Sequence, residues 1–166
     1  MKNALVKLKS KEATLVGILT ARGWKAGTIA SGNFCKENLI SEQVFKNKVM
    51  KSDTYGVNLL LRQMMGDDTY PIVIDGAGIG TGVTPPTAED TALENEIVGD
   101  IAITDMNIVD GDLVIDIFIP NADLPNNEYT EFGLKMDTRL FTHAAFYYNK
   151  GSNQDTTIEY TVIMNV

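Results

Sequence analysis

The feature that most constrains the fold is a series of strand-like segments that runs from Ile97 to Val166. Apolar and polar residues alternate in these segments, which is typical of strands that bury one face. Two such apolar faces are Leu113, Ile115, Ile117 and Ile119, and Ile158, Tyr160, Val162, Met164 and Val166. Turn signals, most clearly Asp110-Gly111 and Asp137-Thr138, separate the segments, and no helical pattern intervenes. The sequence therefore predicts a mainly β protein, an antiparallel β-sandwich closed by one covering α-helix.

Three more strands are predicted within this region, at Asp100–Ile108, Tyr129–Met136 and Arg139–Tyr148. Burial of several such apolar faces stabilises a fold by about 1.5–3 kcal/mol for each large side chain. The region therefore contains enough apolar surface for the core of one domain.

The covering helix is predicted at Thr54–Met65. Ser52 or Asp53 can cap its first turn, and Gly66 can supply the left-handed residue that ends it. Apolar residues recur there at helical spacing, namely Val57, Leu60, Leu61 and Met64. We expect this face, and with it the pair Met64-Met65, to pack on the core.

Charge divides the chain into two parts and predicts two regions. Residues 1–51 carry ten Lys or Arg and three Asp or Glu, a net charge of +7, whereas residues 52–166 carry four and nineteen, a net charge of −15. We therefore expect a basic, extended N-terminal arm at 1–51 and a β-sandwich body at 52–166. Within the arm, residues 3–9 alternate as an exposed strand would, and residues 21–33 are rich in glycine and predict a loop.

The arm has two possible roles. It is either a solvated basic segment or a segment that docks on an acidic neighbour, for which another copy's body is one candidate. Lys7, Lys9, Lys11 and Trp24 are the candidate interface residues. Nucleic acid is a weaker candidate partner, because the lysines are scattered and the acidic body would repel phosphate.

Several classes of protein are disfavoured by what the sequence lacks. Cys35 is the only cysteine, which excludes an internal disulfide and a cysteine-based zinc site within one chain. No apolar stretch approaches the roughly 20 residues that a membrane helix needs. The first residues also lack the apolar core of a signal peptide. We expect a protein that stays in the cytoplasm where it is made, or joins a particle assembled there, without contacting a membrane.

The segment Asp75–Glu96 contains four glycines at alternate positions, followed by Pro85-Pro86. It is not a phosphate-binding P-loop, because Val83 follows the last glycine where that loop needs Lys and Ser or Thr. The two prolines also argue against the helix that a dinucleotide-binding fingerprint requires. We expect the glycines to let the backbone approach another chain or turn through positive φ. The interface candidates here are Gly78, Gly80, Gly82, Pro85 and Pro86. Thr87 and Asp90 predict a capped single turn through Thr91–Glu94.

No catalytic, cofactor-binding or metal-binding residues are predicted. His143 is the only histidine, and its place in an alternating strand favours a structural role. Acidic pairs occur at Asp67-Asp68, Asp110/Asp112 and Glu128/Glu131, but nothing in the sequence places any pair across a cleft as glycosidase chemistry requires. The spacing of a calcium-binding EF-hand loop is absent at Asp110–Asp112.

Five segments, in order, resemble a family of tailed-bacteriophage virion proteins, the collar-type N-terminal domain of tail fibres and its stand-alone relatives in tails and baseplates. The segments are YGVNLL at 55–60, IGTGVTPPTAEDTALENE at 79–96, EYTEFGL at 128–134, RLFTHAAF at 139–146, and KGS at 150–152 with the terminal strand at 158–164. His143 stands where the family usually has arginine. The resemblance covers roughly residues 52–166 and leaves residues 1–51 as the expected particle-specific contact.

This resemblance implies a non-enzymatic structural part of a virion that attaches or positions fibres or neighbouring tail proteins, works as a homo-oligomer and uses no cofactor. A long tail fibre continues well beyond this domain, so an adaptor of the tail, baseplate or collar is the better expectation. An alternative is a receptor- or carbohydrate-binding sandwich or a head decoration protein, with Tyr147-Tyr148 or Tyr129 as its aromatic platform. A cell-wall hydrolase that uses the acidic residues is a third possibility.

Overall fold

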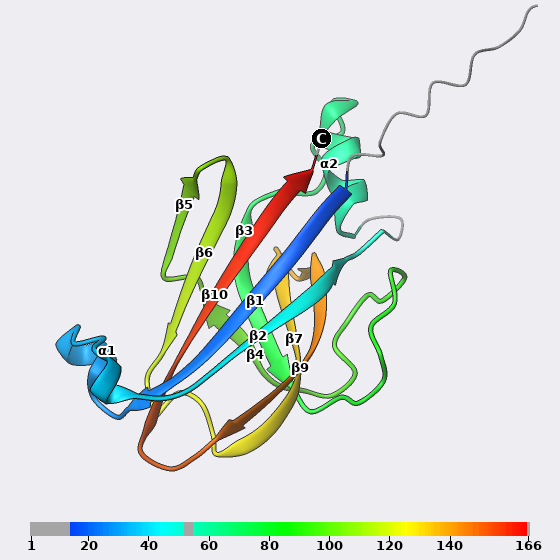
Figure 1. The fold of residues 1–166 in the computed structure, drawn as a ribbon. Helices are drawn as coiled ribbons and strands as arrows, with labels where there is room; N and C mark the ends of the chain where they lie inside the picture. The colour runs from blue at the N-terminus through cyan, green and yellow to red at the C-terminus, as the bar shows by residue number, and fades with distance from the viewer. Residues whose placement is uncertain (1–13, 52–54, 166) are drawn as a thin grey trace, which may run out of the picture.

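The computed structural model describes residues 14–51 and 55–165, and among these residues it contains ten strands and three short helices (Figure 1). The first elements are β1 (Thr14–Lys25), α1 (Thr28–Ser31), the 3₁₀ helix η1 (Lys36–Asn38), β2 (Leu39–Val49), α2 (Val57–Met64) and β3 (Ile74–Gly80). The remaining strands are β4 (Glu96–Ala102), β5 (Asp105–Val109), β6 (Asp112–Ile119), β7 (Asn127–Met136), β8 (Arg139–Leu140), β9 (Thr142–Lys150) and β10 (Gln154–Asn165).

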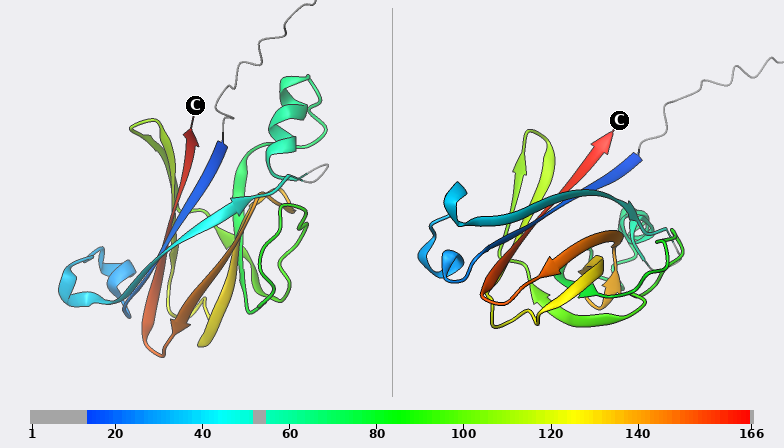
Figure 2. Two further views of the ribbon diagram at one scale, coloured as in Figure 1. Left: turned by 45° about the vertical axis from the view of Figure 1, so that its right-hand side comes forward. Right: turned by 60° about the horizontal axis from the view of Figure 1, so that its bottom comes forward.

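The strands form two antiparallel sheets that face each other (Figure 2). One sheet has the order β2-β1-β10-β6-β5, and the other has the order β4-β3-β7-β9 with β8 beside β7. The two sheets join where β2 meets β9, at the pairs Lys48–His143 and Val49–Thr142. This arrangement confirms the predicted mainly β, sandwich-like class.

The core lies between the two sheets and follows the predicted alternation. Its members include Ile115, Ile117, Phe132, Leu134, Phe146, Ile158 and Tyr160, all nearly or fully buried. The aromatic rings meet across the layers, because Phe132 of β7 lies 6.4 Å from Tyr160 of β10 between ring centroids. Phe132 also lies 6.3 Å from Phe146, which is in the same sheet. The alternate residues of the same strands face outward, so the pattern determines which residues form the core.

The turns predicted after β5 and β7 are confirmed. Asp110 and Gly111 both have positive φ, 53° and 94°, which is the geometry of a type I′ hairpin turn between β5 and β6. Asp137 has a φ of 58° in the turn between β7 and β8. Two-residue turns of this kind match the twist of the strands that they connect.

Residues 14–49, predicted as part of an arm, instead provide two strands of the sandwich. β1 lies between β2 and β10 and pairs with β10 from Thr14–Asn165 to Lys25–Gln154. Leu19 and Ala21 are fully buried, while Lys25 and Lys46 are exposed. Lys25 and Lys46 therefore lie on the solvent side of an ordinary pair of strands. Residues 1–13, with the predicted strand at 3–9, lie outside the described residues.

The loop predicted at 21–33 is also partly a strand. β1 continues to Lys25, and only the residues beyond it form the connection that contains α1. Trp24 is buried near the end of β1, and its Nε1 donates a hydrogen bond of 2.8 Å to the Thr157 hydroxyl. Gly23 lies within β1 and does not end it. Its missing side chain leaves space for the side chains of Gln154 and Ser41.

The predicted helix exists, but its apolar face is turned differently from the expectation. α2 begins at Val57, three residues later than predicted, and the capping candidates Ser52 and Asp53 lie outside the described residues. Leu59 is the residue that enters the core. Met64 and Met65 are 83% and 85% exposed, so the expectation that they pack on the core is wrong. Gly66, with a φ of 82°, follows the end of the helix as predicted.

Candidate functional site

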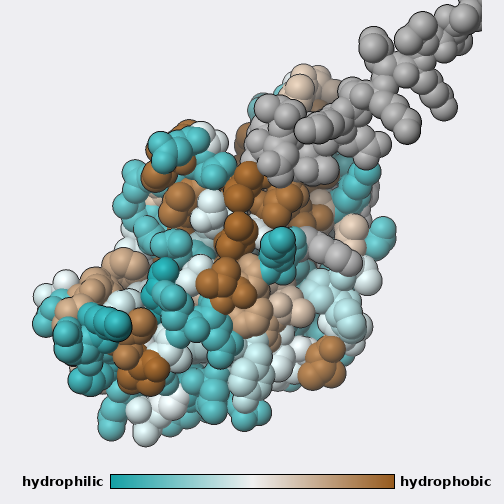
Figure 3. Space-filling view, in the orientation of Figure 1, coloured by the Kyte–Doolittle hydropathy of each residue, from teal (hydrophilic) through white to brown (hydrophobic). Residues whose placement is uncertain are grey.

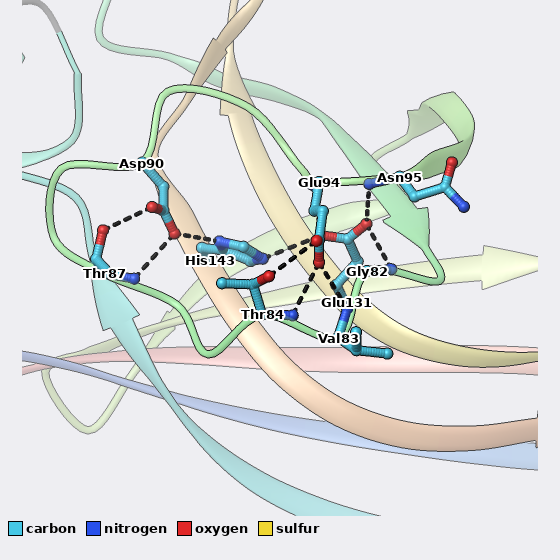
Figure 4. Close-up of polar contacts among 9 residues, drawn as sticks. All are labelled: Gly82, Val83, Thr84, Thr87, Asp90, Glu94, Asn95, Glu131 and His143. Carbon is cyan, nitrogen blue, oxygen red and sulfur yellow. Dashed lines mark hydrogen bonds and ion pairs between the residues drawn. The ribbon is translucent and has the colours of Figure 1, made fainter.

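The outer face of the β4-β3-β7-β9 sheet is covered by the loop that connects β3 to β4, residues 81–95. Leu93 of this loop is buried and contributes to a small apolar cluster with Met50 and Leu140. The polar residues of the loop meet Glu131 of β7 and His143 of β9, which point outward from the sheet beneath it (Figure 4). We call the contacts of residues 82–95 with Glu131 and His143 the loop latch.

Glu131 is the centre of the loop latch. Its side chain is only 2% exposed and accepts hydrogen bonds from three backbone amides, those of Gly82 at 3.0 Å, Glu94 at 2.8 Å and Asn95 at 2.7 Å. These donors come from both ends of the loop. A buried carboxylate is stable only when such donors replace its water, and charge-assisted hydrogen bonds of this kind are the strong ones.

His143 connects Glu131 to Asp90 in the middle of the loop. The imidazole is 4% exposed, with Nε2 at 3.2 Å from Glu131 Oε2 and Nδ1 at 2.7 Å from Asp90 Oδ2. Asp90 also accepts hydrogen bonds from the amide of Thr87 at 2.9 Å and from its hydroxyl at 2.6 Å. Burial, the largest influence on Asp90, raises its pKa, but the hydrogen bonds from Thr87 and His143 together hold that pKa below 3.8.

Glu94 closes the start of the loop. It accepts hydrogen bonds from the amides of Val83 and Thr84 at 2.7 Å and 2.8 Å and from the Thr84 hydroxyl at 2.8 Å. The Thr84 hydrogen bonds lower the pKa of Glu94. Thr87 and Asp90 make the predicted capping contacts, but residues 91–94 form bends rather than a helical turn.

The contacts of the loop latch hold residues 82–95 against the sheet. Both ring nitrogens of His143 contact carboxylates, one of the covering loop and one of the sheet, so the imidazole joins the two. A polar pocket of about 400 Å³ lies beside the latch, lined by Thr84, Glu89, Asp90, Glu94 and His143. The described residues contain no group of three or more His, Cys, Asp or Glu side chains that could hold a metal ion.

The candidate glycines are buried within this chain. A Cβ would lie 2.3 Å from Glu96 Oε2 at Gly78, 2.3 Å from the Asn95 carbonyl oxygen at Gly80, and 2.6 Å from Glu94 Cβ at Gly82. None of the three has a positive φ. They therefore allow the end of the covering loop to approach β3, and the expectation that they turn through positive φ is wrong, whereas contact with another chain stays a prediction.

The other candidate interface residues have different surroundings. Lys7, Lys9 and Lys11 lie outside the described residues. Pro85 is exposed and Pro86 is half-buried, so part of the loop surface remains available to a neighbour. Trp24 is buried against Thr157 and is not an exposed contact.

The proposed aromatic platform is also mostly buried. Tyr129 and Tyr148 are in the core, where burial raises the pKa of Tyr148 to about 12. Tyr147 is exposed, and its hydroxyl donates to Glu128 at 3.0 Å, which raises its pKa. An aromatic surface that sequence reasoning missed lies elsewhere, where Phe34 packs 5.2 Å from Trp24 and 5.4 Å from Phe118 between ring centroids.

This second surface is a pocket of about 360 Å³ on the outer face of the β2-β1-β10-β6-β5 sheet. Besides the three aromatic side chains, it is lined by Arg22, Asp116 and Glu159. Asp116 lies directly opposite Glu159 in the register of β6 and β10. Burial, followed by repulsion from Glu159 and Asp105, raises the pKa of Asp116.

Lys150 is a buried charge of another kind, at the end of β9. It is 1% exposed, and Nζ donates to the Asn121 side-chain oxygen at 2.7 Å and to the Gly151 carbonyl at 2.9 Å. Burial lowers its pKa. Because the ammonium group is enclosed by these partners, Lys150 fixes the turn between β9 and β10.

No family model, curated protein or solved structure matches this chain. Within residues 14–51 and 55–165, none of the helices has the length and apolar character that crossing a bilayer demands.

Proposed function

We propose that this protein is a structural component of a bacteriophage virion, an adaptor of the tail, baseplate or collar that attaches or positions fibres or neighbouring tail proteins. The observation that carries the proposal is the loop latch. It brings together three segments that resemble the virion family, because Gly82 to Asn95, Glu131 and His143 lie in separate motifs of the sequence. The hydrogen bonds join residues that are distant in the sequence, and this gives a physical reason for the three motifs to occur in one chain.

The latch also suits a part that is held by other subunits. Loops of this length are usually functional or disordered, and this one is fixed to the sheet by buried charges and backbone amides. A fixed loop presents a defined surface, including exposed Pro85 and Val83, at no further ordering cost on assembly. The proposed partners are other virion proteins and further copies of this chain, and the proposed location is the assembled virion.

Mass spectrometry of phage particles tests the proposal. Particles would be purified through a density gradient from a lysate in which the chain is expressed, and the copy number per particle would be measured against a labelled standard peptide. We expect the chain to co-sediment with the particles at a fixed copy number. Recovery only in the soluble fraction, with none in the particles, would remove the proposal.

A second candidate function is recognition of a receptor carbohydrate at the particle surface. The pocket that contains the exposed rings of Phe34 and Phe118 favours it, because sugar rings pack on aromatic side chains, while carboxylates accept hydrogen bonds from hydroxyls and arginine donates hydrogen bonds to them. A glycan array probed with the full chain tests this function. Binding that is lost in Phe118→Ala and kept in Tyr147→Ala would support it, and an array without signal would exclude it.

A further inference from the structure

An apolar cleft opens at the end of the sandwich where β1 begins and β10 ends. It lies between the β5–β6 hairpin on one side and α2 with the residues that follow it on the other. It has a volume of about 460 Å³, and its lining includes Leu15, Leu60, Ile72, Met106, Ile108 and Val162. Figure 3 shows apolar residues gathered between the hairpin and α2.

The cleft leaves large apolar side chains in contact with water. Ile108 is 79% exposed, and Val73 and Met106 are also exposed. Contiguous exposed apolar surface on a folded domain usually marks an interaction site. Along one rim the cleft is bounded by β5, an edge strand that pairs with β6 alone among the described strands. A free strand edge beside an apolar cleft can bind an extended segment, because the backbone pairs with the edge while alternate side chains enter the cleft.

The N-terminal segment of the chain has the sequence that such a site requires. In residues 3–9 the apolar residues Ala4, Val6 and Leu8 occupy alternate positions, and Lys7 and Lys9 occupy positions between and after them. An extended segment with this sequence presents an apolar face to a cleft and a basic face away from it.

Charge also favours this occupant. Residues 1–13 contain four Lys and one Glu, a net charge of +3, whereas residues 14–166 contain ten Lys or Arg and twenty-one Asp or Glu, a net charge of −11. The hairpin beside the cleft carries Asp105, Asp110 and Asp112. Acidic bodies repel one another, and a basic segment from one body docked on the acidic hairpin of the next offsets that repulsion.

We propose that the cleft binds residues 3–9 of a second copy of this chain as a strand beside β5. This inference rests on the proposed function, because it supplies the contact by which copies of the adaptor associate. The direction of β1 favours a segment from a second copy over the segment of the same chain. β1 starts at Thr14 beside the cleft and runs away from it, so residues 10–13 alone would have to reverse the chain for residues 3–9 to enter the cleft of their own chain.

Disulfide crosslinking between two differently tagged chains tests the proposal. Both chains carry Cys35→Ser, which removes the only native cysteine. One also carries Val6→Cys and the other Ile108→Cys, so only contact between copies can join them. We expect a mixed dimer on a non-reducing gel after mild oxidation. The matched control replaces Ile108→Cys with Val44→Cys, an exposed valine on β2 away from the cleft, and should give no dimer.

A single chain that carries both Val6→Cys and Ile108→Cys separates the two sources of the segment. If this chain closes on itself and the mixture gives no dimer, the cleft binds its own segment and the proposal is overturned. If neither experiment gives a crosslink, the segment does not occupy the cleft and the proposal is also overturned.

Light scattering after size-exclusion chromatography supplies an independent readout. We expect the full chain to show a mass above that of one copy, and both removal of residues 1–13 and Ile108→Asp to shift the mass to that of a single chain. An unchanged mass in both variants would contradict the proposal. If the chain is monomeric in solution but present in particles, only this inference is wrong. If the chain associates in solution but is absent from particles, only the proposed function is wrong.

Discussion

Glu131 joins both ends of the covering loop to the sheet. Three amides and one imidazole from separate segments converge on its two oxygens. The loop therefore does not depend on regular secondary structure for its shape, because one buried carboxylate satisfies donors at both of its ends. Replacement of one carboxylate oxygen by an amide group takes an acceptor away from donors that are buried or partly buried.

We expect Glu131→Gln to lower the free energy of unfolding by about 3 kcal/mol, the order of magnitude for breaking a buried, hydrogen-bonded charge network. The amide that replaces one carboxylate oxygen would face N–H donors. Urea denaturation monitored by circular dichroism measures the change. Glu128→Gln is the matched control on the same strand, because Glu128 is exposed and its replacement should change stability by less than about 0.5 kcal/mol. Equal stability of Glu131→Gln and the parent chain would refute the role of the latch.

Asp90 predicts a pH dependence of stability with a definite sign. The pKa of Asp90 in the folded protein lies below its unfolded value near 3.8, because hydrogen bonds from Thr87 and His143 outweigh its burial. The stabilisation is therefore fully present above pH 3.8 and is lost as the pH falls through the lower, folded pKa.

The free energy of unfolding of the parent chain and of Asp90→Asn should differ by a constant amount above pH 3.8 and converge below it. Urea titrations at a series of pH values measure both curves. A difference that grows as the pH falls would have the wrong sign for a carboxylate with a lowered pKa.

At the scale of the elements, β3 depends on glycines because the covering loop returns across it. A Cβ at Gly80 would lie 2.3 Å from the backbone oxygen of Asn95 and 2.5 Å from Glu131 Oε1, whereas at Gly76 the nearest atom would be 3.7 Å away. The alternate glycines of this strand thus differ in what they face. Contact with a backbone atom is the harder one to relieve, because the backbone of the loop must move.

We therefore expect Gly80→Ala to destabilise the fold by about 1–3 kcal/mol or more, as overpacked sites do. Gly76→Ala should be close to neutral, since its Cβ makes an ordinary contact and the unfolded chain loses entropy. Thermal unfolding of the two variants beside the parent chain makes the comparison. Similar melting temperatures for both variants would show that the loop does not pack against β3 as described.

Most strands after Ile97 were predictable from the sequence because their alternation matches the faces that they bury. The single strand predicted at Asp100–Ile108 is wrong, because this segment divides into the end of β4 and most of β5, which lie in different sheets, and β5 is exposed throughout. The position of β1 was not predictable, since the basic charge of residues 1–51 suggested an arm, although Lys25 of β1 and Lys46 of β2 are simply solvent-exposed residues of paired strands. α2 was predicted, but Leu59, which enters the core, was not part of the chosen stripe. The loop latch could not be predicted from the spacing of residues in the sequence, because Asp90, Glu131 and His143 meet only in the folded chain. The one sequence signal that included all three residues was the resemblance of their segments to the virion family.

At the scale of the whole molecule, the boundary at residue 51 divides one sandwich rather than two regions. β1 pairs on both sides, with β10 and with β2, and β2 also joins the second sheet at Lys48 and Val49. Residues 14–49 are therefore needed for the body to fold. The part of the predicted arm that can still act as a separate contact is residues 1–13.

Two truncations test this division. Removal of residues 1–13 should leave the far-ultraviolet circular dichroism spectrum and cooperative unfolding of the body intact, because all pairs of β1 with its neighbours remain. Removal of residues 1–50 should abolish cooperative unfolding, because it deletes two strands that contact the core. A folded body after the longer truncation would show that the basic region is an appendage after all.

The central claim, that this sandwich is a fixed part of a phage particle, is tested most directly by immunogold electron microscopy of purified particles. An antiserum raised against the chain should place gold at one defined position on the tail, baseplate or collar of intact virions. Labelling that stays at the background of a pre-immune serum, on particles whose known structural proteins are labelled in parallel, would contradict the claim.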